Sequence, residues 1–526
     1  MMKTKLMLIL LLGALAAQAQ TIEVSGLQSG TWQADTVKVV GNIKVQDSLC
    51  IAPGTTVLFG GFYQIAVEND SRLNAVGTET DSILFTIADT TGFHLFNSGR
   101  GGWNGIRLSK AGTSRFEYCR FQYGKAALDS DQDGGALRIF HSDAVEIGHS
   151  TLFCNFSREH GGALSAIESI VTIYDCEVSN NLTYTELDTV FGMYGGGMRF
   201  HKCIVDITGT DFLYNIGNSA IGGALSLDSC AVNIDRCRFE QNVGVNGGGL
   251  YLMRSKDYPC HITNSLFTNN TSNHFGGGLA ICDASPSLSN LTVVNNHSIG
   301  VNCGGIFFYQ YSSPYLRNCI VYGNTNNAPL EKPVQIWSWT FEDDGPQFIN
   351  CLIQYGIENI SGKETINLYE DNIDEDPLFV DAENGNFRLS EGSPCINSGS
   401  THFEDFSAFD LDHNDRVKGN VIDMGAYEFS GAGIGETAQK EQNVRIVGNP
   451  ITATSYAEIE LDVACNLTAS LYSIEGRLLS SKDLGKLQAG CHRIEIGEMF
   501  QSLNSGTYLF VVGNGQKTFA NKVVKP

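Results

Sequence analysis

The chain has 526 residues and a formal net charge of −23 at pH 7. A chain of this length is too long for one ordinary hydrophobic core, so we expect several domains or an elongated repeat fold. The acidic balance and the absence of a Lys/Arg cluster argue against nucleic-acid binding, which needs cationic side chains to neutralise phosphates.

The first residues predict a cleaved export signal. Two lysines precede an apolar stretch from Leu6 to Leu15, and Ala17-Gln18-Ala19 is a small-x-small pattern that signal peptidase accepts before Gln20. An apolar run this short cannot cross a bilayer core of about 30 Å as a stable helix. We therefore expect residues 1–19 to be removed, and the mature chain to be secreted or to lie at the cell surface without a transmembrane segment.

Blocks of two or three glycines followed by a small or apolar residue recur along the middle of the chain. Aligned on their first position, which is glycine except at Cys303, the blocks begin at positions 134, 161, 195, 222, 247, 276 and 303. The spacings of 27, 34, 27, 25, 29 and 27 residues indicate a structural repeat of one kind.

A second motif runs in phase with the glycine blocks. Phenylalanine is followed three positions later by asparagine at Phe212 to Asn215, Phe239 to Asn242 and Phe267 to Asn270, and the residues between the two motifs alternate between apolar and polar. Short strands at a period near 28, without hairpin signals, predict coils that stack in a parallel β-solenoid. Residues 37–110 alternate in the same way and are expected to form the opening coils.

The repeats assign structural roles to several residue types. We expect Leu137 and Ile139 and their counterparts to point into the core, and the recurring asparagines to stack at a turn. Fifteen cysteines are spread over the chain, several at the repeat spacing, and are interpreted as small buried residues. Cys465 and Cys491 are the exception, because they lie together near the C-terminus and are candidates for a disulfide.

The GGA(L) and FxxN repeats over residues 116–356 resemble those of chlamydial polymorphic membrane proteins, which are β-helical surface adhesins. More widely, they resemble the right-handed β-helix families that include pectate-lyase-like proteins. The resemblance implies an all-β fold with a right-handed parallel β-helix over residues 20–375. It is specific for the fold and carries little information about the activity.

Two further segments carry resemblances. Asp376–Asp381, Gly392–Gly399 and Asp423–Phe429 are similar to the segment that closes many bacterial surface β-helix proteins ahead of an interchangeable anchor, which implies a closing segment of the choice-of-anchor type over 376–429. A linker rich in Gly, Ala and polar residues follows over 430–442.

Residues 443–526 resemble the type IX secretion sorting domain of Bacteroidota, on the motifs Val444–Pro450, Leu471–Leu479, Gly506–Val512 and Lys522–Pro526. Alternating strands in this stretch predict a small β-sandwich. The resemblance implies that the type IX secretion machinery recognises this domain at the outer membrane, where it is usually removed as the passenger is released or attached to surface lipopolysaccharide.

Alternating carboxylates precede a glycine at Asp129, Asp131 and Asp133, as in the first half of a calcium loop. The twelfth position is Phe140, so an EF-hand is excluded. A simpler Ca²⁺ turn and a solvated acidic turn both remain open. Asp410, Asp412 and Asn414 pose the same question, and no other cofactor is indicated.

Residues four and six places after each block start are expected to face outward from the coils. Together they offer a candidate binding face, with a plain surface or packing role as the alternative for each residue: Arg199, His201, Asp228, Tyr251, Phe307 and Tyr309. Exposed aromatic rings on such a face suit sugar rings or a protein partner.

The sequence contains no cluster of paired carboxylates with an adjacent base and no catalytic motif for hydrolysis or phosphate chemistry. The preferred hypothesis is therefore a non-catalytic, adhesin-like surface or secreted protein that binds a polysaccharide or a surface or matrix protein. The alternative is a secreted polysaccharide lyase or glycoside hydrolase that works in a groove along the rod, with calcium near Asp129 to Asp133.

Overall fold

The computed structural model describes residues 20–525 with gaps at 185–192, 301, 329–331, 342–344, 402–406, 418–420, 430–443, 448–450, 452–454, 462–464, 474–477, 489, 502, 504–505 and 514–517. The chain divides into two compact units, one that ends at Phe429 and one that begins at Ser430. The expected signal peptide and linker lie outside the described residues.

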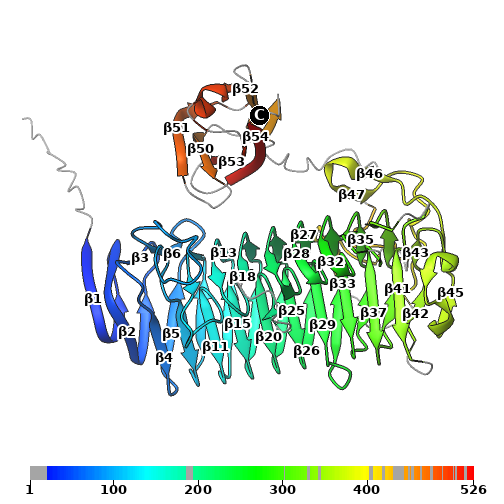
Figure 1. Ribbon diagram of the computed structural model, residues 1–526, viewed down its shortest axis with the longest axis horizontal. Helices are drawn as coiled ribbons and strands as arrows, with labels where there is room; N and C mark the ends of the chain where they lie inside the picture. Colours follow the sequence, from blue (N-terminus) through cyan, green and yellow to red (C-terminus); the bar gives the residue numbers. More distant parts are fainter. Residues whose placement is uncertain are drawn as a thin grey trace, which may run out of the picture. The chain divides into compact units, whose positions relative to one another are not determined.

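The first unit consists of coils that stack side by side from β1 to β45 (Figure 1). A complete coil contributes one short strand to each of four ladders, A to D, in which every pairing between coils is parallel. Ladder A contains β4 (Ile65–Glu68), β7 (Ile106–Ser109), β11 (Leu137–Phe140), β15 (Leu164–Ile167), β20 (Met198–His201), β25 (Leu225–Asp228), β29 (Leu250–Met253), β33 (Leu279–Cys282), β37 (Ile306–Gln310), β41 (Ile336–Thr340) and β44 (Ile360–Ser361).

The other ladders follow in chain order. Ladder B contains β5 (Arg72–Val76), β8 (Ser114–Glu117), β12 (Val145–Gly148), β16 (Ile170–Tyr174), β21 (Ile204–Thr208), β26 (Ala231–Asp235), β30 (Cys260–Thr263), β34 (Ser287–Ser289), β38 (Tyr315–Arg317), β42 (Gln347–Ile349) and β45 (Leu368–Glu370). Ladder C contains β3 (Thr56–Phe59), β6 (Ile83–Ile87), β9 (Cys119–Gln122), β13 (Thr151–Phe153), β17 (Glu177–Ser179), β22 (Asp211–Leu213), β27 (Arg238–Glu240), β31 (Leu266–Thr268), β35 (Thr292–Val294), β39 (Ile320–Tyr322) and β43 (Leu352–Ile353).

Ladder D contains β10 (Lys125–Ala126), β14 (Phe156–Ser157), β18 (Leu182–Tyr184), β23 (Ile216–Asn218), β28 (Val243–Asn246), β32 (Thr271–Phe275), β36 (His297–Ser298) and β40 (Thr325–Asn326). Two short strands, β19 (Met193–Tyr194) and β24 (Ala220–Ile221), pair beside it.

Two long strands form the N-terminal end of the first unit. β2 (Thr36–Ile51) pairs in turn with β3, β4 and β5, so that a single strand begins three ladders. β1 (Thr21–Trp32) pairs with β2 in parallel, with register shifts next to Gly26 and Gly30. β1 is the edge of the sheet among the described strands.

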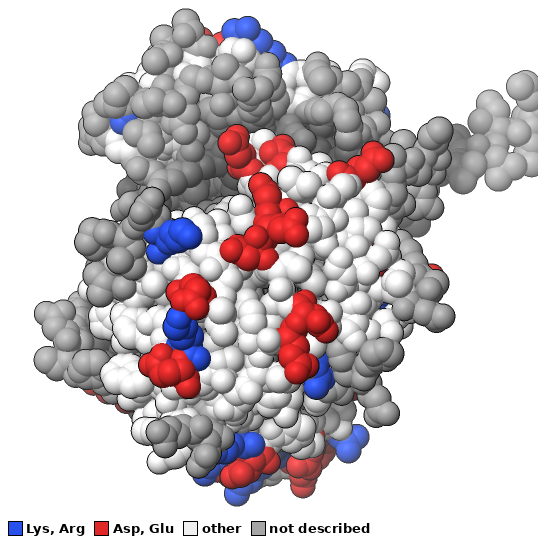
Figure 2. Space-filling model, turned by 90° about the vertical axis from the view of Figure 1, so that its right-hand side faces the viewer, with Lys and Arg blue, Asp and Glu red and all other residues white. Residues whose placement is uncertain are grey.

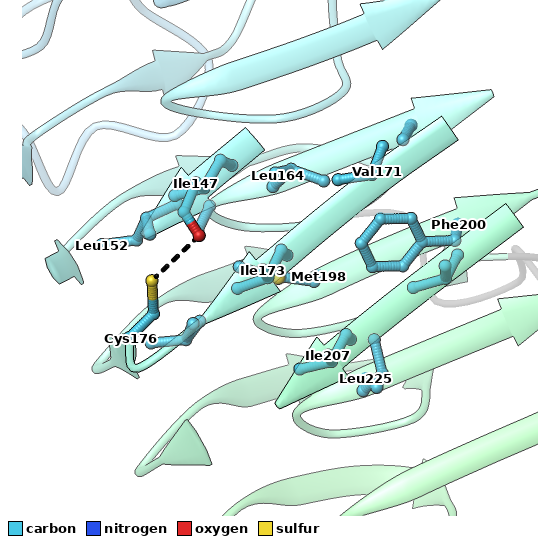
Figure 3. Packing of buried hydrophobic residues seen from close by; sticks show 14 of the residues in the cluster. Ile147, Leu152, Leu164, Val171, Ile173, Cys176, Met198, Phe200, Ile207 and Leu225 are labelled. Carbon is cyan, nitrogen blue, oxygen red and sulfur yellow. Dashed lines mark hydrogen bonds between the residues drawn. The ribbon is translucent and has the colours of Figure 1, made fainter. Parts of the chain in front are cut away.

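Side chains that alternate inward along ladders A, B and C form one continuous core (Figure 3). The predicted inward positions Leu137, Ile139 and their counterparts are fully buried, which confirms the repeat alignment. Phe212, Phe239 and Phe267 stack face to face, with centroid distances of 4.7 and 4.5 Å between successive rings. Identical registers in neighbouring coils therefore place like side chains on like side chains.

The recurring asparagines form a buried ladder at the turn between ladders C and D. Asn242 is typical: its Oδ1 accepts hydrogen bonds from N and Nδ2 of Asn215, and its Nδ2 donates to Asn270 Oδ1 and to Phe212 O. Ladder members from Asn155 to Asn324 make the same contacts with the next coil, which confirms the predicted structural role. Side-chain amides thus provide hydrogen-bond partners for backbone groups where the chain turns away from β geometry.

The glycine blocks mark a sharp corner before ladder A. Gly161 has φ of +61°, and a Cβ on Gly162 would lie 2.3 Å from the carbonyl oxygen of Gly196 in the next coil. The first glycine of a block therefore supplies the left-handed backbone, and the second allows adjacent coils to approach.

Most of the cysteines pack as small buried residues, as the sequence predicts. Fourteen are free thiols, and Cys176 is typical, with its Sγ 3.5 Å from the carbonyl oxygen of Ile147 in the preceding coil (Figure 3). Cys465 is one of the free thiols and is half-buried, while the side chain of Cys491 lies outside the described residues. A pairing of these two stays a prediction.

The described residues between 376 and 429 pack on the outer face of ladder C. The antiparallel pair β46 (Phe379–Asp381) and β47 (Asn386–Leu389) contributes to an apolar cluster with Leu266, Val294 and Ile320. Arg416 is fully buried and pairs with Glu428 at 3.3 Å, and burial raises the pKa of Glu428 to about 7 despite the opposing charge of Arg416. The closing segment thus extends the first unit and has its own apolar and ionic contacts.

The second unit consists of two antiparallel sheets, in agreement with a small β-sandwich. One sheet contains β48 (Val444–Val447), β49 (Tyr456–Leu461) and β52 (Gly490–Glu495), and the other contains β51 (Leu478–Leu487), β50 (Cys465–Ser473), β53 (Gly506–Gly513) and β54 (Thr518–Lys525).

Helical structure in the described residues is limited to the short 3₁₀ turns η1 (Ile357–Asn359), η2 (Lys363–Thr365), η3 (Ala382–Asn384) and η4 (Gly497–Phe500). Across the part of the chain that the structure describes, no helix is long and apolar enough to span a membrane.

The asparagine ladder generates a first prediction. Asn242→Ala should lower the free energy of unfolding by about 3 kcal/mol, because it leaves two buried N–H groups of Asn215 without partners and removes a side-chain hydrogen bond to Phe212 O. Asn233→Ala is the control, since the exposed Asn233 makes one side-chain bond, to Asp206, and should cost about 0.5 kcal/mol or less. Urea unfolding followed by circular dichroism measures both, and equal effects would contradict the ladder's role.

Candidate functional site

The outer face of ladder A presents two in-register rows of side chains. Parallel pairing aligns the second residue of each strand with its counterpart in the next coil, and likewise the fourth residue. We call the first set the inner row: Arg107, Arg138, Ser165, Arg199, Ser226, Tyr251, Ala280, Phe307 and Trp337. We call the second set the outer row: Ser109, Phe140, Ile167, His201, Asp228, Met253, Cys282, Tyr309 and Trp339.

The inner row is covered along most of its length. The residues before the glycine blocks, which include Tyr194 and Phe275, lie against it, and Phe275 stacks on Phe307 at 4.4 Å between ring centroids. Arg199 and Tyr251 are each 8 % exposed, and Phe307 is 5 % exposed. These three predicted binding residues therefore point away from the main core, as expected, but pack in a second buried corner and do not form an open face.

The C-terminal half of this corner is apolar. Tyr251, Ala280, Cys282, Cys303 and Phe307 form a separate hydrophobic cluster, joined by partly buried neighbours that include Trp337. Burial raises the pKa of Tyr251 well above its ordinary value. Tyr251 and Phe307 therefore pack beneath the turns, which is one of the two roles that the sequence left open.

The outer row is more open, and in its middle a charged network links three coils. His201 Nδ1 lies 2.7 Å from Asp228 Oδ2, and Arg254 Nε lies 2.8 Å from Asp228 Oδ1. Burial acts to raise the pKa of Asp228, but the hydrogen bonds from Arg254 and Ser229 and the charges of Arg254 and His201 outweigh it, so the pKa is lowered. Asp228 is therefore an ionised acceptor that holds His201 with Nδ1 protonated and leaves Nε2 as the basic nitrogen.

The C-terminal end of the outer row is an exposed aromatic group. Tyr309 and Trp339 lie side by side with centroids 5.5 Å apart, and Tyr311 and Phe341, one position beyond each strand, lie 4.8 Å apart. Trp339, Phe341 and Tyr311 are 57, 54 and 51 % exposed. We call Tyr309, Tyr311, Trp339 and Phe341 the aromatic patch.

The three aspartates of the candidate calcium turn do not share one partner. Asp129 pairs with Arg158 at 2.6 Å, and Asp131 pairs with Arg107 at 2.7 Å and with Arg138 at 3.4 Å. Asp133 forms no ion pair among the described residues, and burial raises its pKa against the charges of Arg199 and Arg138. Two of the three carboxylates are thus engaged by guanidinium groups, which compete with a calcium ion for them.

A different set of potential metal ligands occurs nearby. Single ligand atoms of Asp133, Glu159 and His160 lie within 4.8 Å of one another. Burial lowers the pKa of His160 to about 4, aided by the charge of Arg199, so its imidazole is neutral at pH 7. Arg199 acts electrostatically on both Asp133 and His160, which opposes the binding of a cation between them.

The second acidic turn is structural. Asp410 Oδ1 accepts hydrogen bonds from the backbone nitrogens of Asp412 and Asn414 at 2.9 and 2.7 Å, and its Oδ2 accepts from Glu428 N at 2.8 Å. Asp412 forms a bidentate pair with Arg388. Asp410 therefore fixes the closing segment through backbone donors.

Several residues of this face were not found from the sequence. Trp337 and Trp339 belong to a coil in which Val334 and Gln335 replace the glycine pair, so the block alignment ended one coil too early. Arg254 follows strand β29 at a residue with φ of +49°, outside the two counted positions. Charged residues follow other ladder A strands at the same position, as Lys202 and Asp283 do. This recurrence was the available signal.

Comparison with known proteins supports the architecture. Residues 97–288 match the family model described as the right-handed β-helix region. The stacked coils form a right-handed parallel β-helix. A search of curated proteins found no match. The matched β-helix residues include the charged network and precede the aromatic patch, so the comparison supports the scaffold and gives no ligand.

The half-buried His160 generates a second prediction. Because the folded β-helix binds a proton at His160 only near pH 4, while the unfolded chain binds one near pH 6.5, folding stability from this group is complete above pH 6.5 and is lost as the pH falls towards 4. His160→Gln should remove about 1 to 3 kcal/mol of the stability difference between pH 7 and pH 4.5.

Urea unfolding at the two pH values measures this difference. His274→Gln is the control, because His274 is exposed and its substitution should leave the pH dependence unchanged. A His160→Gln protein with the same pH dependence as the wild type would show that the imidazole is not held neutral by the fold.

Proposed function

We propose that this protein is an exported right-handed β-helix that binds a polysaccharide along the outer row of ladder A, without cleaving it. The observation that carries the proposal is the aromatic patch, in which four rings come from two neighbouring coils and three of them, Tyr311, Trp339 and Phe341, are exposed. Large exposed apolar groups are costly in water and mark binding surfaces when polar residues surround them.

The geometry of the patch suits a chain of sugar rings. Rings in adjacent coils stand one strand spacing apart, about 4.8 Å, and present flat faces and edges on which the C–H faces of pyranose rings can stack. The parallel ladder fixes these rings on rigid strands, which lowers the entropic cost of binding. A polysaccharide with repeating sugar units therefore matches a surface that is built from repeating coils.

The electrostatics favour an uncharged polysaccharide at this end. Figure 2 shows the end of the β-helix beyond β41, where acidic side chains predominate over basic ones among those coloured by charge. The segment from Glu370 to Asp376 alone contains five exposed carboxylates. An anionic polymer would be repelled there, whereas stacking on aromatic rings needs no charge on the ligand.

The proposal includes the route by which the protein reaches its ligand. Residues 1–19 are proposed as the export signal, the closing segment 376–429 as a choice-of-anchor-type region, and residues 443–526 as the sorting domain for type IX secretion. The mature protein is then secreted or lies on the cell surface. Support comes from the sequence motifs and from the antiparallel sheets of the second unit.

A direct test uses the mature chain, residues 20–526, on arrays of plant, host and microbial polysaccharides, with retention and released products both measured. Trp339→Ala should weaken retention at least tenfold, about 1.4 kcal/mol, because it removes the most exposed ring of the patch. Ile204→Ala on ladder B is the matched control, since Ile204 is also 57 % exposed. Retention on matrix proteins alone would contradict the polysaccharide ligand.

A second candidate function, a polysaccharide lyase or hydrolase, is favoured by the His201 network. Asp228 orients His201 and leaves its Nε2 as a base on the outer row, which is an arrangement that general-base catalysis uses. Release of unsaturated or reducing-end products by the wild type, with loss in His201→Ala, would replace the non-catalytic proposal by this one. Calcium has no assigned part in either function.

A further inference from the structure

The corner above the inner row of ladder A contains an unusual set of buried polar atoms. Seven side-chain atoms in it are buried and have no hydrogen-bond partner among the residues that the structure describes: Asp133 Oδ1, Arg138 Nε, Ser165 Oγ, Arg199 Nε and Nη1, Ser226 Oγ and Asn246 Oδ1. Buried polar atoms in folded proteins are nearly always paired, because an unpaired one costs about 1 to 3 kcal/mol. A concentration of them in one place indicates that the place is built for a polar occupant.

These atoms form a continuous line. Arg138, Ser165, Arg199 and Ser226 pair in register across four consecutive coils of ladder A. Asp133, which bridges to His160 in the next coil, belongs to the covering side of the same corner. At about 4.8 Å per coil, the line extends over about 14 Å.

Arg199 is the centre of this line. Its side chain is more than nine-tenths buried, and it has neither a hydrogen bond nor an ion pair to any described residue. The guanidinium group lies over the ring of Tyr194, whose centroid is 6.0 Å from the guanidinium carbon. A buried guanidinium without a counter-charge is strongly unfavourable, since its hydration has been lost and not replaced.

The neighbouring carboxylates are engaged elsewhere. Asp228 is held by Arg254 and His201, and Asp131 by Arg107 and Arg138. Asp133 remains, and its charge acts on Arg199, but the two groups form no ion pair in the described part of the chain. Arg199 is therefore a cation of the corner that no salt bridge neutralises.

The chemistry of the unpaired atoms specifies the occupant. Three are N–H donors of guanidinium groups and two are hydroxyls that can donate, against two acceptor oxygens. Such a donor-rich set fits an oxyanion, whose oxygens accept several hydrogen bonds and whose charge matches the guanidinium. A divalent cation fits poorly, because Arg199 is the nearest unpaired charge.

We propose that the corner between Asp133 and Ser226 is a binding site for an oxyanion, a phosphate, sulfate or carboxylate group, held by Arg199 with Ser165, Ser226 and Arg138. Arg138, whose side chain is 36 % exposed, and the half-buried His160 bring this corner into contact with solvent. The site is separate from the aromatic patch, which begins at β37, four coils beyond Arg199. It is independent of the proposed polysaccharide function.

The test measures anion binding by the mature chain, residues 20–526, with isothermal titration calorimetry and thermal unfolding at constant ionic strength. Inorganic phosphate and sulfate represent free anions, glucuronate and galacturonate represent an oxyanion carried by a sugar, and galactose and sodium chloride are the ligand controls. We expect one site with a Kd below about 1 mM for at least one oxyanion. Binding of the uronates alone would identify a sugar-borne source, and binding of the inorganic ions a free one.

Variants locate the site. Arg199→Gln should weaken binding at least tenfold, and Ser165→Ala should weaken it about threefold while it changes the fold least. Arg120→Gln removes a half-exposed arginine on ladder C and should leave binding unchanged. Trp339→Ala should also leave it unchanged, so that a failure of this inference is distinguishable from a failure of the polysaccharide proposal.

The inference is overturned if no oxyanion binds more tightly than chloride, which would assign the corner to ordered water. It is also overturned if anion binding is equal in the wild type, Arg199→Gln and Ser165→Ala. If Arg199→Gln does not fold, the oxyanion affinity of Ser165→Ala compared with that of the wild type decides whether the corner is the binding site.

Discussion

The structure depends on one constraint, which is that successive coils pair in the same register. In ladders A, B and C each residue pairs with a counterpart of the same orientation in the coil before and the coil after. A side chain that points inward in one coil therefore rests on an inward side chain in the next, and the phenylalanine stacks and the asparagine ladder follow from this single constraint. Changes of loop length between ladders leave it intact, as the 34-residue coil from 161 to 194 demonstrates.

The same register separates two environments on the outside of ladder A. Alternate residues belong either to the inner row, which the turns cover, or to the outer row, which remains more open. The inner row changes along the axis from charged and hydroxyl side chains to aromatic ones. Function can therefore vary from coil to coil on the outside, while the core that holds the coils together stays the same.

Much of the fold followed from the sequence, because the repeat encodes it directly. Periodic glycines, phenylalanines and asparagines predicted the stacked coils, the inward positions of Leu137 and Ile139 and the burial of most cysteines. Alternation also predicted which residues point away from the core. It could not predict which of these are covered, because cover comes from the turns, whose lengths differ between coils.

The candidate site was predictable only in part for the same reason. Asp129, Asp131 and Asp133 look like one acidic turn in the sequence, but guanidinium groups from other coils divide them. Arg107 is 24 residues from Asp131 along the chain and directly beside it in space. Arg199 was identified from its position in the repeat, while its lack of partners depends on neighbours from several coils, which a single repeat does not contain.

The N-terminal edge strand has a consequence for self-association. A parallel β-helix ends in unpaired backbone groups, and a regular edge would allow a second molecule to continue the sheet, as in fibril growth. In β1 the pairing shifts by more than one residue at Gly26 and again near Gly30, and these glycines have φ of +71° and +81°. These shifts coincide with the corners of the coil, where β2 changes its pairing from β3 to β4 and from β4 to β5. The edge therefore offers an incoming strand three short stretches instead of one long strand.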